Sequence, residues 1–143
     1  MKTGFVPYAL AAGAFCLAAS APVQSKSIHF MTSLAGASEV PANSTPGKGT
    51  LDAHLDTATG AFSYTITYSG LTGPAVAAHF HGPAGAGVNA PPVIPIKDLA
   101  SPIKGNAVLT PAQMDDLQAG KWYLNVHTKA NPGGEIRGQL LAP

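Results

Sequence analysis

Apolar and polar residues alternate along much of this chain, a pattern typical of strands with one buried face. The clearest case is residues 61–68, where Phe, Tyr and Ile occupy every second position between Ser, Thr or Ala. Residues 49–55 alternate in the same way, and residues 56–60 between these segments have the composition of a hairpin loop that ends in glycine. Further strands are expected around His79 and His81 and at residues 27–34, 93–96, 122–128 and 135–141.

One short helix is expected among these strands. Thr110 is placed to cap it, Pro111 takes the first helical position, and Gln113 has the spacing of a capping box. Met114 and Leu117 give it an apolar edge. Gly120 is expected to end the helix after two turns at most.

Frequent turns separate these elements, since the chain contains 13 prolines and 16 glycines. Seven or eight short strands with one helix predict an all-β fold, an antiparallel Greek-key β-sandwich. Pro92 precedes the segment at 93–96 and Pro95 lies within it, and both favour an edge position, because proline cannot donate to a central ladder.

The first residues have a different character. Met1 and Lys2 precede an apolar run over residues 5–19, and small residues follow at 18–21. This arrangement is typical of a secretory signal peptide and is short for a membrane span. We expect a signal peptide at residues 1–25, one β-sandwich domain at residues 26–143, and a periplasmic or secreted location. The mature chain has no apolar segment long enough to cross a membrane.

Composition excludes several kinds of chemistry. The only cysteine, Cys16, lies in the expected signal peptide, so the mature domain has neither a disulfide nor a thiol nucleophile. The formal net charge is +1 with no basic cluster, which argues against nucleic acid as a partner. A homodimer or another protein partner is left open by these features.

Three histidines offer the most specific chemistry. On the strand that contains them, His79 and His81 share one face, opposite Val76, Ala78 and Phe80. His127 points away from the apolar face of residues 122–128, as does Asn125. If the two strands are neighbours, the three imidazoles converge outside the core, and a Gly/Pro/Ala loop at residues 82–92 leaves space above them. Imidazole is a preferred ligand of transition metals, so a metal site at His79, His81 and His127 is expected.

The surroundings of this site leave alternatives open. His29, His54, Met31 or a water molecule could supply a fourth ligand, although His54 beside Asp52 and Asp56 also fits a solvated surface position. Glu135 could form a surface ion pair with Arg137 across strands, or accept a hydrogen bond from an imidazole N–H. A structural pair of Arg137 with Glu39 is a further interpretation.

Five segments carry a resemblance to a known family. They are residues 34–41 (LAGASEVP), 68–73 (YSGLTG), 78–84 (AHFHGPA), 125–128 (NVHT) and 131–140 (NPGGEIRGQL). Together they resemble the CHRD domain, named after repeats in chordin and found as single exported domains in bacteria. The resemblance covers nearly all of the mature chain and implies an all-β domain.

A second, looser resemblance concerns the metal. The His-x-His segment on the outer face of a Greek-key sandwich is similar to the copper site of copper–zinc superoxide dismutases, although this chain lacks their disulfide and zinc-loop histidines. The expected function is therefore copper binding or redox handling by an exported protein. The alternatives are a dismutase-like copper enzyme and a metal-free extracytoplasmic protein-interaction module.

Overall fold

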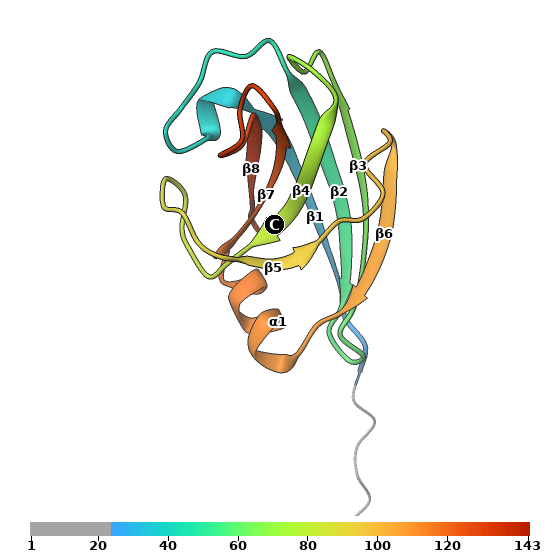
Figure 1. Ribbon diagram of the computed structural model, residues 1–143. Helices are drawn as coiled ribbons and strands as arrows, with labels where there is room; N and C mark the ends of the chain where they lie inside the picture. Colours follow the sequence, from blue (N-terminus) through green and yellow to red (C-terminus); the bar gives the residue numbers. More distant parts are fainter. Residues whose placement is uncertain (1–23) are drawn as a thin grey trace, which may run out of the picture.

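The computed structural model describes residues 24–143, so the expected signal peptide lies almost entirely outside the described residues. Within residues 24–143 there are eight strands, one α-helix and one short 3₁₀ helix (Figure 1), which confirms the predicted all-β class. In chain order the elements are β1 (Ser27–Ala35), η1 (Gly36–Ser38), β2 (Lys48–Asp56), β3 (Ala61–Ser69), β4 (Ala75–His81), β5 (Pro92–Pro95), β6 (Ile103–Val108), α1 (Pro111–Gln118), β7 (Trp122–Thr128) and β8 (Ile136–Leu140).

The strands form two antiparallel halves. The hydrogen-bonded order is β5-β4-β7-β8-β1-β2-β3-β6, and β8 meets β1 through the single pair Ala35–Arg137. The halves fold over each other, because Phe62 and Tyr64 on β3 contact Phe80 on β4, with ring centroids 5.3 and 5.0 Å apart. Four strands separate β3 from β4 in the order, so this contact requires a sandwich-like arrangement.

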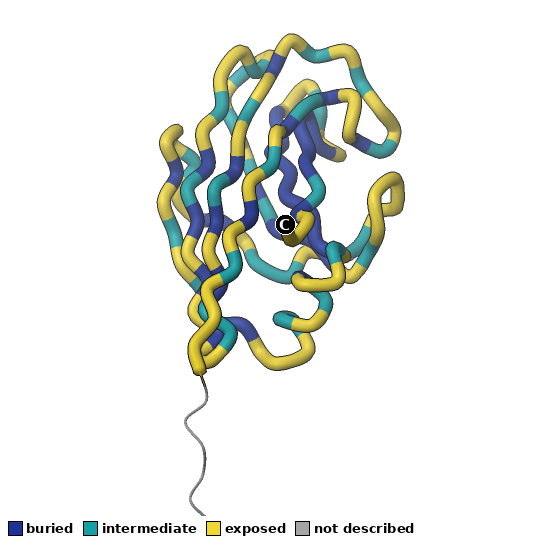
Figure 2. Tube along the Cα trace, turned by 180° about the vertical axis from the view of Figure 1, so that it is seen from behind, coloured by how far each residue is buried: buried dark blue, intermediate teal, exposed yellow. Residues whose placement is uncertain are grey.

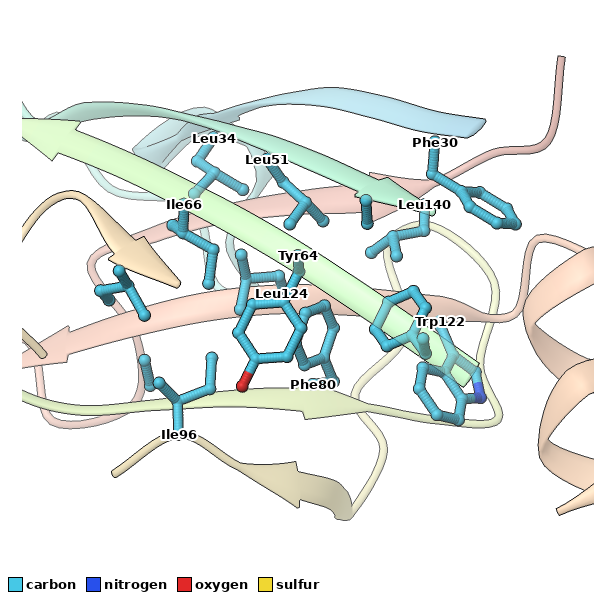
Figure 3. Close-up of a cluster of buried hydrophobic side chains, with 14 of the residues drawn as sticks. Phe30, Leu34, Leu51, Tyr64, Ile66, Phe80, Ile96, Trp122, Leu124 and Leu140 are labelled. Carbon is cyan, nitrogen blue, oxygen red and sulfur yellow. The ribbon is translucent and has the colours of Figure 1, made fainter. Parts of the chain in front are cut away.

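The core lies between the two halves (Figure 3). Aromatic side chains fill one part of it, and Phe62 packs edge-on against both Phe80 and Trp122. The predicted alternation of β2 and β3 is confirmed, since every second residue is buried over residues 51–55 and 62–66. Aliphatic and small side chains from several strands complete the core: Leu34, Leu51, Ala53, Leu55, Ile66, Leu124, Val126, Ile136 and Leu140.

Helix α1 has the predicted boundaries. The hydroxyl of Thr110 accepts from the backbone N–H of Gln113, and the Gln113 side chain accepts from the backbone N–H of Thr110. Leu117 is fully buried and anchors the helix to the core. Gly120 follows at a φ of 70°, a conformation that favours glycine. In the described part of the chain no helix is long and apolar enough to span a membrane.

Two details differ from the sequence-based expectation. Strand β6 was not predicted, because its less exposed positions are filled by Ile103, Gly105 and Ala107, which give little apolar contrast with the residues between them. Val76 was expected on the core face but is 48% exposed. The pairing of β4 with β7 shifts between Ala75 and Ala77, so Val76 lies at a β-bulge. Its side chain therefore does not follow the inward and outward alternation of the residues after it.

Strands β7 and β8 are covered on both faces. All seven residues of β7 are buried, and four of the five in β8 are buried as well. Their tubes are almost continuously dark in Figure 2, whereas those of β1, β2 and β3 alternate. One face contributes to the apolar core. The other carries polar side chains, among them Asn125, His127 and Arg137, and forms a buried polar layer.

The bulge in β4 can be tested by stability. Phe80 is fully buried among aromatic rings, so Phe80→Ala should lower the free energy of unfolding by about 3–5 kcal/mol. Val76→Ala on the same strand should change it by less than about 0.5 kcal/mol, because Val76 faces solvent. Urea unfolding of both variants measures this. A comparable loss for Val76→Ala would mean that Val76 belongs to the core.

Candidate metal centre

His79, His81 and His127 meet on the polar face of β4 and β7. These strands are neighbours, and Ala77 is paired with His127 while His79 is paired with Asn125. One nitrogen from each histidine lies within 4.8 Å of the others. His79 Nδ1 is 3.2 Å from His127 Nε2. The structure thus brings together the three residues singled out by strand parity.

Backbone carbonyl groups fix the tautomer of two of these rings. His81 Nδ1 lies 2.9 Å from the carbonyl oxygen of Ala90, and His127 Nδ1 lies 2.9 Å from that of Pro132. A carbonyl oxygen only accepts, so the hydrogen-bond network assigns the proton to Nδ1 in both rings. Nε2 of each neutral ring then keeps its lone pair. In His81 this atom is buried and has no hydrogen-bond partner among the described residues.

The histidines face away from the apolar core, but they are not surface residues. His81 and His127 are only 8% and 9% exposed. Both bond to loops, His81 to residues 82–91 and His127 to residues 129–134. His79 is half-buried and is the most accessible of the three. The expected open space above His81 is therefore partly closed by the loops themselves.

The electrostatics favour neutral rings. Burial lowers the pKa of His79, and the nearby His127 and His81 lower it further. Burial is also the largest influence on the pKa of His81, which is lowered although its bond to Ala90 opposes the shift. Only a neutral imidazole can donate its lone pair to a metal. His79 and His81 accordingly stay available as ligands at a pH where a solvated histidine begins to take up a proton.

Tyr123 links the histidines to a fixed positive charge. The ring of His81 stacks on Tyr123 at a centroid distance of 4.7 Å, and the guanidinium carbon of Arg137 lies 3.4 Å from the Tyr123 centroid. Arg137 also donates to the side chain of Asn89 and the carbonyl of Val88, which holds residues 82–91 in place. The sequence could have pointed to Tyr123, because residues 123, 125 and 127 alternate along β7 and Tyr123 therefore shares a face with Asn125 and His127.

Comparison with known families gives a direct result. A model of the CHRD domain matches residues 30–140, from within β1 to the end of β8. The chain belongs to the CHRD domain family. This confirms the resemblance drawn from the five sequence segments, and the three histidines of the CHRD domain lie inside the matched range. Neither the curated proteins nor the solved structures contain a match to the chain.

Glu135 of this CHRD domain has a role that the sequence did not suggest. It is fully buried, and among residues 24–143 it forms neither an ion pair with Arg137 nor a hydrogen bond with an imidazole, so both interpretations of it were wrong. Its carboxylate instead accepts hydrogen bonds from four residues of three loops and of β7: Thr45, Thr72, Thr128 and Asn131. Spacing along the chain gives no sign of this, because the donors are up to 90 residues away.

Arg137 forms no described ion pair with Glu39 either, although its charge acts on that carboxyl group. Glu39 is 5% exposed, and its Oε1 has no hydrogen-bond partner among residues 24–143. Gly134 lies against it at a φ of 132°, and a Cβ there would collide with the Glu39 carboxylate. Burial raises the pKa of Glu39 to about 7 against the opposing effect of Arg137.

The three side chains suggested as a fourth ligand lie elsewhere. His29 is paired with His54 across β1 and β2, and Met31 is paired with Asp52. The register places His79 level with Ala35, which is six residues along β1 from His29. At roughly 3.3 Å per residue, His29 is on the order of 20 Å from His79 along the strand direction. These side chains cannot complete the same coordination sphere.

The buried Glu135 carboxylate makes a prediction about acid stability. Burial alone would raise its pKa, but hydrogen bonds from Thr128, Thr45 and Thr72 outweigh this and lower it to about 2 from 4.5. The carboxylate therefore stabilises the fold above pH 4.5, and this contribution, on the order of 3 kcal/mol, is lost as the pH falls toward 2. Glu135→Gln should be less stable at pH 7 and lose less stability between pH 4.5 and 2. Parallel urea titrations over this range measure the effect, and equal pH slopes would contradict it.

The contribution of Glu39 to stability should depend on pH in the opposite direction. Because its pKa is raised from 4.5 to about 7, the folded state holds a proton that the unfolded chain releases. Its contribution is present below pH 4.5 and falls by up to about 3 kcal/mol as the pH rises to 7. Glu39→Gln should gain stability relative to the wild type across this window. The same unfolding series checks this, and a constant difference between the two proteins would refute the assignment.

Proposed function

We propose that this CHRD domain binds one copper ion through His79, His81 and His127. The observation that carries the proposal is the hydrogen bonding of the rings: Ala90 and Pro132 hold the protons of His81 and His127 on Nδ1. Metal-binding histidines commonly use one nitrogen for the metal and the other for such an acceptor. Buried imidazoles with fixed tautomers are thus oriented before any ion arrives.

The distances suit a transition metal. Bonds from a metal to imidazole nitrogen are about 2.0–2.1 Å, so two ligands at a tetrahedral angle are about 3.3 Å apart. His79 Nδ1 and His127 Nε2 are 3.2 Å apart, and the nitrogen of His81 lies within 4.8 Å of both. Three nitrogen ligands leave further positions for water or an exchanging ligand.

Copper is favoured among metals that accept imidazole. Cu(II) stands above Zn(II) and the earlier divalent ions in intrinsic affinity for nitrogen ligands. The residues around the site include no cysteine, since Cys16 is the only one in the chain. A site of three imidazoles with an accessible His79 is therefore expected to bind Cu(II) more tightly than Zn(II).

The cellular role follows from the export signal expected at residues 1–25. An exported copper-binding domain would act in the periplasm or outside the cell, in copper binding or redox handling. A dismutase-type enzyme would need a cation exposed to guide an anionic substrate. Arg137 is 1% exposed and already bonded to Asn89 and Val88, so copper binding is the better-supported function.

Copper titration of metal-free protein tests the proposal. In competition with a chelating indicator, the wild type should bind one Cu(II) tightly, with nitrogen hyperfine structure in its electron paramagnetic resonance spectrum. His79→Ala, His81→Ala and His127→Ala should each weaken this binding at least tenfold, since even residues that only support a ligand cost 10–100-fold. His79→Ala is the most informative, because His79 is the least buried of the three.

The matched control is His54→Ala, which should leave the tight site unchanged because His54 lies on β2. Circular dichroism of each variant shows whether it is folded. Unchanged tight binding in the folded triple variant would exclude these ligands and favour a metal-free interaction module. Tight binding of Zn(II) with no preference for copper would retain the site but correct its metal.

A further inference from the structure

A second group of side chains with imidazole and carboxylate ligand atoms lies on the outer face of β1 and β2. His29 and His54 are directly opposite each other in the antiparallel register. Their rings are parallel within 3° and have centroids 4.3 Å apart. Asp52 precedes His54 by two residues and therefore shares its face of the strand. All five histidines of the chain belong either to this group or to the one on β4 and β7.

Both rings direct the same atom at one carboxylate oxygen. Asp52 Oδ1 is 3.2 Å from His29 Nε2 and 3.3 Å from His54 Nε2. The ligand atoms of the three residues lie within 4.8 Å of one another, as in the first group. Separations of this size are what two ligands at about 2.0–2.2 Å from one metal ion produce. The side chains are 44–51% exposed, so an ion from solvent reaches them without any loop moving.

Met31 adds a ligand of a different kind. It shares a face of β1 with His29, is paired with Asp52, and is diagonal to His54. Long side chains reach such diagonal neighbours across an antiparallel pair. Met31 is 69% exposed, so it contributes little to the packing of the core. A thioether is a soft ligand that suits Cu(I), whereas imidazole and carboxylate together suit Cu(II).

We propose that His29, His54 and Asp52 form a second, surface-exposed copper site, with Met31 as an additional ligand when the ion is Cu(I). The site is distinct from the buried one, on the order of 20 Å away along the strands. It does not rest on the function proposed for His79, His81 and His127. Weaker binding is expected here, because exposed ligands are less restrained than the buried rings.

Titration with Cu(II) alone, monitored by calorimetry on the full domain, tests this site. The wild type should take up a second equivalent beyond the tight one. The double variant His29→Ala/His54→Ala should lose only this second equivalent, and Asp52→Asn should weaken it at least tenfold. Met31→Leu should leave Cu(II) binding unchanged and weaken Cu(I) binding, measured with a Cu(I)-specific chelator. Ser33→Ala, on the same exposed face of β1, is the matched control and should change neither.

The outcomes separate the two proposals. Loss of the second equivalent alone in His29→Ala/His54→Ala supports the surface site. A wild type that binds one ion, with the double variant unaffected, overturns it and leaves the buried site intact. If the wild type binds copper and the double variant binds none, the result supports the surface site and overturns the buried one. Broadening of backbone amide signals by Cu(II), around His54 or around His79, gives the same answer without substitutions.

Discussion

The covering of β7 and β8 on both faces is the constraint on which this domain depends. Two strands buried in this way cannot leave their polar face to water, and each unsatisfied buried group costs about 1–3 kcal/mol. The loops therefore supply hydrogen bonds from the outside. Glu135 accepts hydrogen bonds from three of these loops, and Arg137 donates to the loop that covers His81. The histidines lie in this layer, and carbonyl groups of the same loops set the tautomers of His81 and His127.

The polar layer is also where hydrogen bonding is incomplete. Four buried side-chain atoms in residues 24–143 have no partner. Two belong to β7 and β8, at Asn125 and Gln139, and the others belong to His81 on β4 and to Glu39 after η1. The apolar side of the same strands shows no comparable conflict. The unpaired atoms are therefore concentrated around the three histidines and the carboxyl group of Glu39.

Strand parity explains why much of the fold could be predicted. Residues 61–68 and 49–55 alternate cleanly, and the helix carries its own capping residues, so local sequence was sufficient there. Strand β6 could not be predicted because glycine and alanine replace large apolar residues. The prediction that Val76 faces the core was wrong because a bulge depends on the partner strand. Parity also grouped the three histidines. Their burial and tautomers could not be foreseen, since they depend on carbonyl groups of loops with no regular pattern. The pairing of His29 with His54 needed the register of β1 against β2.

The two ends of the strand order have a consequence for molecules at high concentration. Strand β5 has only four residues, and Pro92 and Pro95 at its ends carry no N–H for a neighbour. At the other end, β6 exposes Lys104 and contains Gly105, which disfavour the addition of a further strand. Neither edge is a good template for intermolecular β-pairing. The domain can thus keep a large, mostly uncharged β-structure without molecules joining edge to edge into aggregates.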